Sequence, residues 1–187
     1  CLAEGLANNG VVHSIDNNEE TTHIAQTFIQ SSPYANQIIC HLGEAKSCIA
    51  SLNESVPFWD MVWIDAHKAD YAEYYDLCFD KVKPGGLILA DNVLWDGKVV
   101  DADALQNDKD TKALHSFNQK IKSDNRVQPL LLPIRDGILI MRKRWDALYA
   151  QTFYLLKRFK NFWQYIAANQ FGSEWLKVWY AFKVVGV

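Results

Sequence analysis

Short apolar runs alternate with amphipathic segments along most of this chain. The runs that predict strands lie at 11–16, 37–42, 58–65 and 85–92, and the segments that predict helices lie at 17–32, 43–52, 70–82 and 110–124. The runs are continuously apolar, which is typical of parallel strands buried on both faces. Two last runs, at 126–133 and 137–143, flank a short turn and predict an antiparallel hairpin. The pattern predicts an α/β fold, a doubly wound and mostly parallel sheet of the Rossmann-like kind that ends in this hairpin.

Composition narrows the class of protein. A chain of 187 residues with 49% hydrophobic content can bury one sizeable core. A net charge of −3 does not favour nucleic acid as a partner, because nucleic-acid binding needs a clustered basic face. Four cysteines, without the spacing of a metal finger, indicate reduced thiols and a cytoplasmic protein; they are Cys1, Cys40, Cys48 and Cys78.

Oxygen-bearing side chains follow three of the predicted strands. In doubly wound folds, ligands bind beyond the carboxyl ends of the strands. Asp16 fits two roles there, as a cap of the next helix or as the acid that holds a ribose hydroxyl. Asp65, together with Asp91 and Asn92, ends two strands expected to be neighbours. Clustered oxygen ligands of this kind favour a divalent cation between them, and Mg²⁺ is the cation that best suits them.

Three stretches resemble one enzyme family. They are IDAHKADY (64–71), KPGGLILADNVLWDGKV (83–99) and LLPIRDGILIMRK (131–143). They are similar to the cation-dependent O-methyltransferases that include caffeoyl-CoA and catechol O-methyltransferases, and the likeness runs over residues 1–144. The family has the class I fold of methyltransferases that use S-adenosylmethionine.

The resemblance implies roles for individual residues. Asp65, Asp91 and Asn92 match the ligands of a divalent cation, with Mg²⁺ expected and Ca²⁺ or Mn²⁺ as alternatives. Lys68 matches the catalytic lysine. The residues matched to the binding of S-adenosylmethionine are Asp16, Gly43, Glu44, Ala45, Asp65 and His67. The implied reaction methylates a hydroxyl of a small phenolic substrate of the catechol or caffeoyl type.

The pairing of Asp65 with Lys68 suits that chemistry. A phenol with a pKa near ~10 is mostly protonated at neutral pH, whereas methyl transfer needs the phenolate. A divalent cation favours the anion, and a nearby lysine can take its proton. Lys68 follows Asp65 by three residues, so both side chains can face one crevice. The alternative is a solvated lysine in a loop between strand and helix.

Some positions depart from the family pattern. His67 stands where plant-type members carry an Asp that contacts the cofactor, so it either serves there or is merely tolerated. Asp96 stands where those members have an Asn near the substrate, which leaves the substrate class open. Trp95 suits either an aromatic wall for a planar phenol or ordinary core packing.

The beginning of the chain raises a separate expectation. CLAEGLANNG (1–10) has the pattern of a helix end closed by Gly10, and none of the nine glycines reproduces the family's glycine-rich cofactor turn. We therefore expect the domain at 1–144 to lack its first strand and that turn, and the chain as given to bind S-adenosylmethionine weakly. Two alternatives follow. One is an inactive methyltransferase fragment, and the other is a receiver-like signalling domain, which the place of Lys68 and the final hairpin disfavour.

Residues 145–187 form an extension rich in aromatic and basic side chains. Residues 148–170 predict one helix that stops at Gly172. A membrane-surface helix, a dimer contact, and packing or appended sequence without a selected role are the alternatives, and the last is favoured. We expect the protein to assemble as a homodimer.

Overall fold

The structure is a computed structural model that describes residues 1–7 and 9–145. Residues Cys1–Arg144 form one compact unit. The helix predicted at 148–170, with its end at Gly172, lies outside the described residues. Within them, no helix has both the length and the apolar character needed to cross a bilayer.

Every strand and helix predicted between residues 11 and 143 is present. The elements are β1 (Val12–Asp16), α1 (Glu19–Gln30), β2 (Ile38–Leu42), α2 (Ala45–Ser55), β3 (Trp59–Ile64), α3 (Tyr71–Phe79), β4 (Val82–Ala90), α4 (Ala102–Asn107), α5 (Lys109–Ser123), β5 (Val127–Leu132) and β6 (Ile138–Lys143). The short helix α4 was not predicted. Residues 2–5 form turns, so the expected helix end before Gly10 is absent there. A helical segment this short is marginal without a packing partner.

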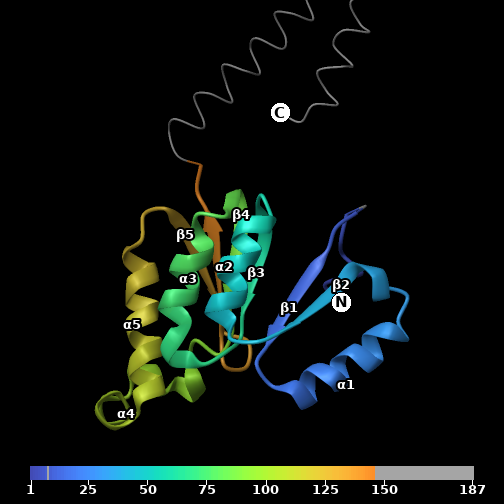
Figure 1. Ribbon diagram of the computed structural model, residues 1–187. Coiled ribbons are helices and arrows are strands. Elements are labelled where there is room, and N and C mark those ends of the chain that lie inside the picture. Colours follow the sequence, from blue (N-terminus) through green and yellow to red (C-terminus); the bar gives the residue numbers. More distant parts are fainter. Residues whose placement is uncertain (8, 146–187) are drawn as a thin grey trace, which may run out of the picture. The chain divides into compact units, whose positions relative to one another are not determined.

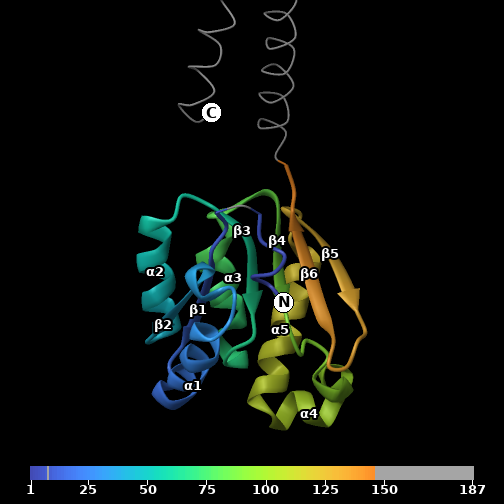
Figure 2. The same ribbon diagram turned by 90° about the vertical axis from the view of Figure 1, so that its right-hand side faces the viewer.

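The strands form two sheets. Parallel strands β1 and β2 make the first, and the second has the order β3-β4-β6-β5. In the second sheet, β3 and β4 run parallel, while β6 is antiparallel to both β4 and β5. This is the predicted mostly parallel α/β arrangement with a final antiparallel hairpin, and Figure 2 shows the strands in the succession β2, β1, β3, β4, β6, β5.

β1 and β3 adjoin without sharing a ladder. They belong to different sheets, although the ring of His13 on β1 lies edge-on to Trp59 at the start of β3, with 5.6 Å between centroids. The facing edges of these two strands therefore have no ladder partner among the described strands. The predicted single sheet is divided at the place where the expected first strand of the fold would lie.

The buried core lies on one face of the four-stranded sheet. Helices α2, α3 and α5 lie next to one another on the same side of these strands (Figure 1). Tyr75 and Phe117 from α3 and α5 are at most 1% exposed and pack towards Ile88 of β4. On the other face, Trp63 of β3 is 42% exposed. The strands are continuously apolar in sequence, but described residues cover only one of their two faces well.

The segment from β1 to β2 contributes little to this core. Thr22 is the only buried residue among the described residues 12–42, and β1 pairs with β2 alone. We expect the backbone amides of β1 and β2 to exchange with solvent at least about 100-fold faster than those of β4 and β6, because few buried contacts oppose local opening. Hydrogen exchange followed by mass spectrometry measures the difference. Equal protection of both sheets would contradict this prediction.

Candidate active site

The predicted metal ligands emerge side by side at the ends of β3 and β4. The two strands pair in parallel with Ile64 opposite Ala90, and the N–H of Asp91 donates to the carbonyl oxygen of Ile64 at 3.0 Å. Asp65 and the Asp91–Asn92 pair are the residues that follow directly. The polar residues at the two strand ends are therefore neighbours in space, as the sequence predicts.

Lys68 lies at the centre of this group and is buried. Its side-chain nitrogen Nζ donates to Asn92 Oδ1 at 2.7 Å, to the hydroxyl of Tyr71 at 2.6 Å and to Asp65 Oδ1 at 3.3 Å. The residue is only 9% exposed, so the alternative of a solvated lysine is wrong. An ammonium group has three N–H bonds, and three acceptors surround this one. The cluster is thus arranged to hold a charged lysine.

Sequence reasoning missed Tyr71, the first residue of α3. Its side chain is fully buried, and its hydroxyl donates to the carbonyl oxygen of Asp91 at 3.1 Å. Burial raises the pKa of Tyr71, and the negative charge of Asp65 raises it further, so the phenol stays protonated at neutral pH. The signal that could have found Tyr71 is its position three residues after Lys68, which brings both onto one side of the turn that starts α3.

The loop after β4 has an unusual backbone. Four of its residues have positive φ: Asn92 (57°), Trp95 (50°), Asp96 (52°) and Gly97 (79°). The left-handed conformation is uncommon outside glycine and rarest for bulky side chains such as Trp. Strained backbone of this kind gathers at functional sites, where the surrounding structure holds it in place. The loop that carries Asn92, Trp95 and Asp96 therefore has the kind of backbone that is typical of functional sites.

Trp95 fits both of its alternatives. Its ring packs against the buried core, and Lys68 Nζ lies 5.7 Å from the ring centroid. A cation at this distance from an aromatic face is attracted to it. Asp96 is exposed on the same loop. The structure thus brings Trp95 to Lys68 and leaves the side chain of Asp96 at the surface.

The hairpin between β5 and β6 supports this loop. The backbone N–H groups of Val93 and Leu94 donate to the carbonyl oxygens of Gly137 (3.1 Å) and Asp136 (2.7 Å). Gly137 has φ 82°, and a Cβ atom there would lie 2.5 Å from Leu94 Cγ. Only glycine suits both the conformation and the close approach. The hairpin predicted from the sequence thus stabilises the conformation of the loop after β4.

The predicted cofactor residues gather at the ends of β1 and β2. The N–H of Gly43 donates to the backbone carbonyl of Asp16 at 2.9 Å. The carboxylate of Glu44 caps α2 by accepting from the N–H of Ser47 at 2.9 Å, and Ala45 is the first residue of that helix. The Ser47 N–H lowers the pKa of Glu44. These residues are close to one another, whereas their contact with a cofactor stays a prediction.

Asp16 stabilises the turn that leads into α1, whose N-cap residue is Asn18. Its carboxylate accepts from the N–H of Asn18 at 2.9 Å and from the hydroxyl of Thr21 at 2.8 Å. These two hydrogen bonds lower the pKa of Asp16, the first more than the second. The helix cap is therefore Asn18 and not Asp16, and the ribose role of Asp16 stays a prediction.

His67 is exposed and contacts Asp70. Its Nδ1 lies 3.0 Å from Asp70 Oδ2, and Asp70 also pairs with Lys46 of α2 at 3.1 Å. The His67 contact, followed by Lys46, lowers the pKa of Asp70. His67 thus joins a surface network between α2 and α3, and its predicted contact with the cofactor remains untested.

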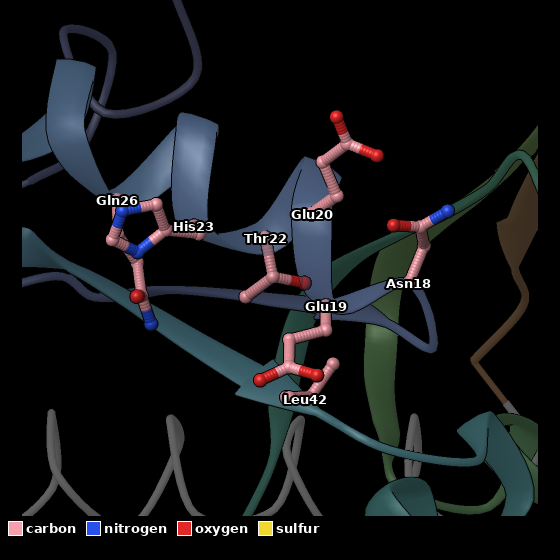
Figure 3. Close-up of a pocket in the computed structure, with 7 residues that line it drawn as sticks. All are labelled: Asn18, Glu19, Glu20, Thr22, His23, Gln26 and Leu42. Carbon is pink, nitrogen blue, oxygen red and sulfur yellow. The ribbon is translucent and has the colours of Figure 1, made fainter.

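A separate depression of about 740 Å³ lies at the start of α1. Figure 3 shows the residues that line it: Asn18, Glu19, Glu20, Thr22, His23, Gln26 and Leu42. None of the predicted site residues lines this depression. The candidate active site is therefore defined by the converging contacts of Lys68.

Comparison with known families decides the assignment. A family model described as O-methyltransferase matches residues 1–144. The chain belongs to the O-methyltransferase family. Curated relatives of this chain include tricin synthase 2 of Oryza sativa subsp. japonica, 32% identical over 151 residues, and caffeoyl-CoA O-methyltransferase 5 of Nicotiana tabacum, 31% identical over 151 residues. Each match covers 76% of this chain, but only 52% of the rice protein and 63% of the tobacco protein.

Solved structures agree with the fold. The O-methyltransferase from Bacillus cereus in complex with SAH superposes with a TM-score of 0.71 and 26% identity, covering 76% of this chain and 67% of that chain. The O-methyltransferase TomG from Streptomyces achromogenes in complex with SAM has the same TM-score at 23% identity. The resemblance and the fold class predicted from the sequence are confirmed.

The side-chain oxygen atoms of Asp65, Asp91 and Asn92 are of the kind that binds hard divalent cations. Asp65 and Asn92 each direct an oxygen to one cationic nitrogen, that of Lys68, and the side chain of Asp65 is 55% exposed. Asp91 Oδ1 accepts from the N–H of Asn92 at 2.7 Å, which leaves its second oxygen available. No group of three or more His, Cys, Asp or Glu side chains suited to a metal occurs in the described part of the chain. Of the three predicted metal ligands, Asp65 and Asp91 are carboxylates, and the third ligand is the amide oxygen of Asn92.

Proposed function

We propose that this protein transfers a methyl group from S-adenosylmethionine to a phenolic hydroxyl of the catechol or caffeoyl type, and that the transfer depends on a divalent cation. The observation that carries the proposal is the convergence of Asp65, Asn92 and Tyr71 on the buried amine of Lys68. Membership of the O-methyltransferase family and a relative named caffeoyl-CoA O-methyltransferase support the reaction and the class of acceptor. SAH in the Bacillus cereus structure supports the methyl donor.

The chain's own residues have defined tasks in this reaction. Lys68 accepts the proton of the phenol, and the methyl group passes from the sulfonium sulfur to the phenolate oxygen, leaving S-adenosylhomocysteine. The three acceptors around Lys68 match the ammonium form, which is the state after it has taken the proton. Trp95, beside Lys68, offers an aromatic wall for the ring of the acceptor, and Asp96 lies on the same loop.

Asp65, Asp91 and Asn92 would hold the cation, with Mg²⁺ expected and Ca²⁺ or Mn²⁺ as alternatives. When bound there, it supplies a Lewis acid that favours the phenolate over the phenol. The residues proposed to contact S-adenosylmethionine are Asp16, Gly43, Glu44, Ala45, Asp65 and His67. We also propose that the protein assembles as a homodimer.

The test is a methyl-transfer assay of the complete natural protein with S-adenosylmethionine and caffeoyl or catechol acceptors. We expect chelation to lower the rate by at least about 100-fold and added Mg²⁺ to restore it, because the loss of a Lewis acid costs several kcal/mol. A phenol with one hydroxyl is the matched control and should be a poor acceptor. Undiminished turnover after exhaustive chelation would disprove the metal dependence, and no transfer to any phenol would disprove the proposed reaction.

A further inference from the structure

We propose that Tyr71 is a positioning residue that fixes the amine of Lys68 to the end of β4. The inference rests on the proposed function, in which Lys68 takes the proton of the phenol. The Tyr71 hydroxyl lies between two parts of the site that are separated in sequence. On one side is Lys68 in the turn before α3, and on the other is the backbone of Asp91.

Proton counting sets the direction of both hydrogen bonds. A carbonyl oxygen can only accept, so the single proton of the Tyr71 hydroxyl goes to Asp91, at 3.1 Å. The phenol oxygen is then left as an acceptor towards Lys68 Nζ, at 2.6 Å. The hydroxyl therefore has one donor role and one acceptor role, and both are used. Tyr71 can hold the lysine only through its oxygen and hold β4 only through its proton.

The other two partners of Lys68 have competing tasks. Asp65 and Asn92 are the proposed cation ligands, and the Asp65 contact is the longest of the three, at 3.3 Å. When these oxygens engage a cation, the Tyr71 hydroxyl is the remaining contact among the three. The buried hydroxyl at the start of α3 thus offers Lys68 a contact that uses none of the proposed metal-binding oxygens.

Packing makes Tyr71 suited to this role. Its ring is fully buried and lies edge-on to Phe117 of α5, with 5.7 Å between centroids. The ring therefore has a fixed orientation, and its oxygen has a fixed position.

The same helix offers a matched control. Tyr75 is also fully buried and packs edge-on against Phe117, at 6.4 Å. Its hydroxyl instead donates to Asp124 Oδ2 at 2.9 Å, away from Lys68. Tyr71→Phe and Tyr75→Phe each delete one buried hydroxyl from α3 and keep the ring, so a general effect on stability is common to both.

The first measurement is steady-state kinetics of the complete natural protein. We expect Tyr71→Phe to lower kcat about 10-fold, with the KM of acceptor and methyl donor within about 2-fold of wild type, because a hydrogen bond to a charged group is lost. Tyr75→Phe should keep the wild-type kcat. In a Lys68→Ala background, Tyr71→Phe should have no further effect, since Tyr71 acts through Lys68. A wild-type kcat in Tyr71→Phe, or additive losses in the double variant, would overturn the proposal.

A second measurement does not depend on activity. In its protonated form, Lys68 should give a slowly exchanging ¹H–¹⁵N signal of its ammonium group, which the Lys68→Ala variant assigns by its absence. We expect the signal to persist in Tyr75→Phe and to be lost to fast exchange in Tyr71→Phe. If wild type transfers no methyl group yet this pattern holds, the proposed function fails and the positioning role stands. If the signal is unchanged in Tyr71→Phe, the positioning role fails whatever the reaction.

Discussion

Replacing Asp91 by alanine is expected to abolish the metal dependence and nearly all turnover of the complete protein. The change removes a charged ligand, and it also removes the acceptor that holds the N–H of Asn92 at 2.7 Å. Two of the three proposed ligands are thus affected at once. Since a bound cation contributes several kcal/mol to charge stabilisation, we expect a loss in kcat/KM of about 1000-fold or more.

Rate measurements across a Mg²⁺ titration test this expectation. Asp91→Asn keeps an oxygen that can accept from Asn92 and should recover part of the rate at high Mg²⁺. Asp76→Ala is the control, because Asp76 is an exposed carboxylate paired with Lys120. Full activity of Asp91→Ala with an unchanged Mg²⁺ response would show that the cation does not bind at the end of β4.

Lys68→Ala is expected to lower kcat by about 10²–10⁴-fold at neutral pH, the usual contribution of a general base. The deficit should shrink as pH rises towards the phenol pKa of ~10, because the acceptor then ionises without help. The sign follows from the charge: the phenolate is the reactive form, and its fraction grows with pH in wild type and variant alike. The rate of the variant depends on this phenolate fraction, whereas wild type has Lys68 to take the proton.

The pH profile of kcat measures this effect. Lys68→Met retains most of the buried volume and should behave like the alanine variant, which separates lost chemistry from lost packing. Lys98→Ala is the matched control, since Lys98 is an exposed lysine on the loop after β4. A deficit that stays constant between neutral and alkaline pH would show that Lys68 orients the acceptor without taking its proton.

Two strand edges beside the proposed cofactor residues are unpaired among the described strands. β1 and β3 have no ladder partner on their facing edges, and Asp16, the proposed ribose ligand, ends β1. We propose that a further strand fills this place in the complete protein, because unpaired edges are normally paired or covered. The chain as given is then expected to bind S-adenosylmethionine weakly.

The predicted sites differ in how well sequence could place them. Asp65, Asp91 and Asn92 follow apolar runs, so strand pairing alone brings them together at one edge. Asp16 and Glu44 follow strands too, but their carboxylates are occupied at the starts of α1 and α2. A carboxylate after a strand serves equally as a helix cap or as a ligand, and the two roles have the same local pattern.

The sequence by itself determined the strand and helix order, the final hairpin and the residues at the strand ends, because these depend on local periodicity and on strands ending where apolar runs end. The tertiary structure decided the burial of Lys68, its contact with Tyr71 and the left-handed loop that β5 and β6 support. It also decided that β1 and β3 do not pair. These features depend on contacts such as Lys68 with Asn92, which are 24 residues apart, and on packing that no local pattern encodes.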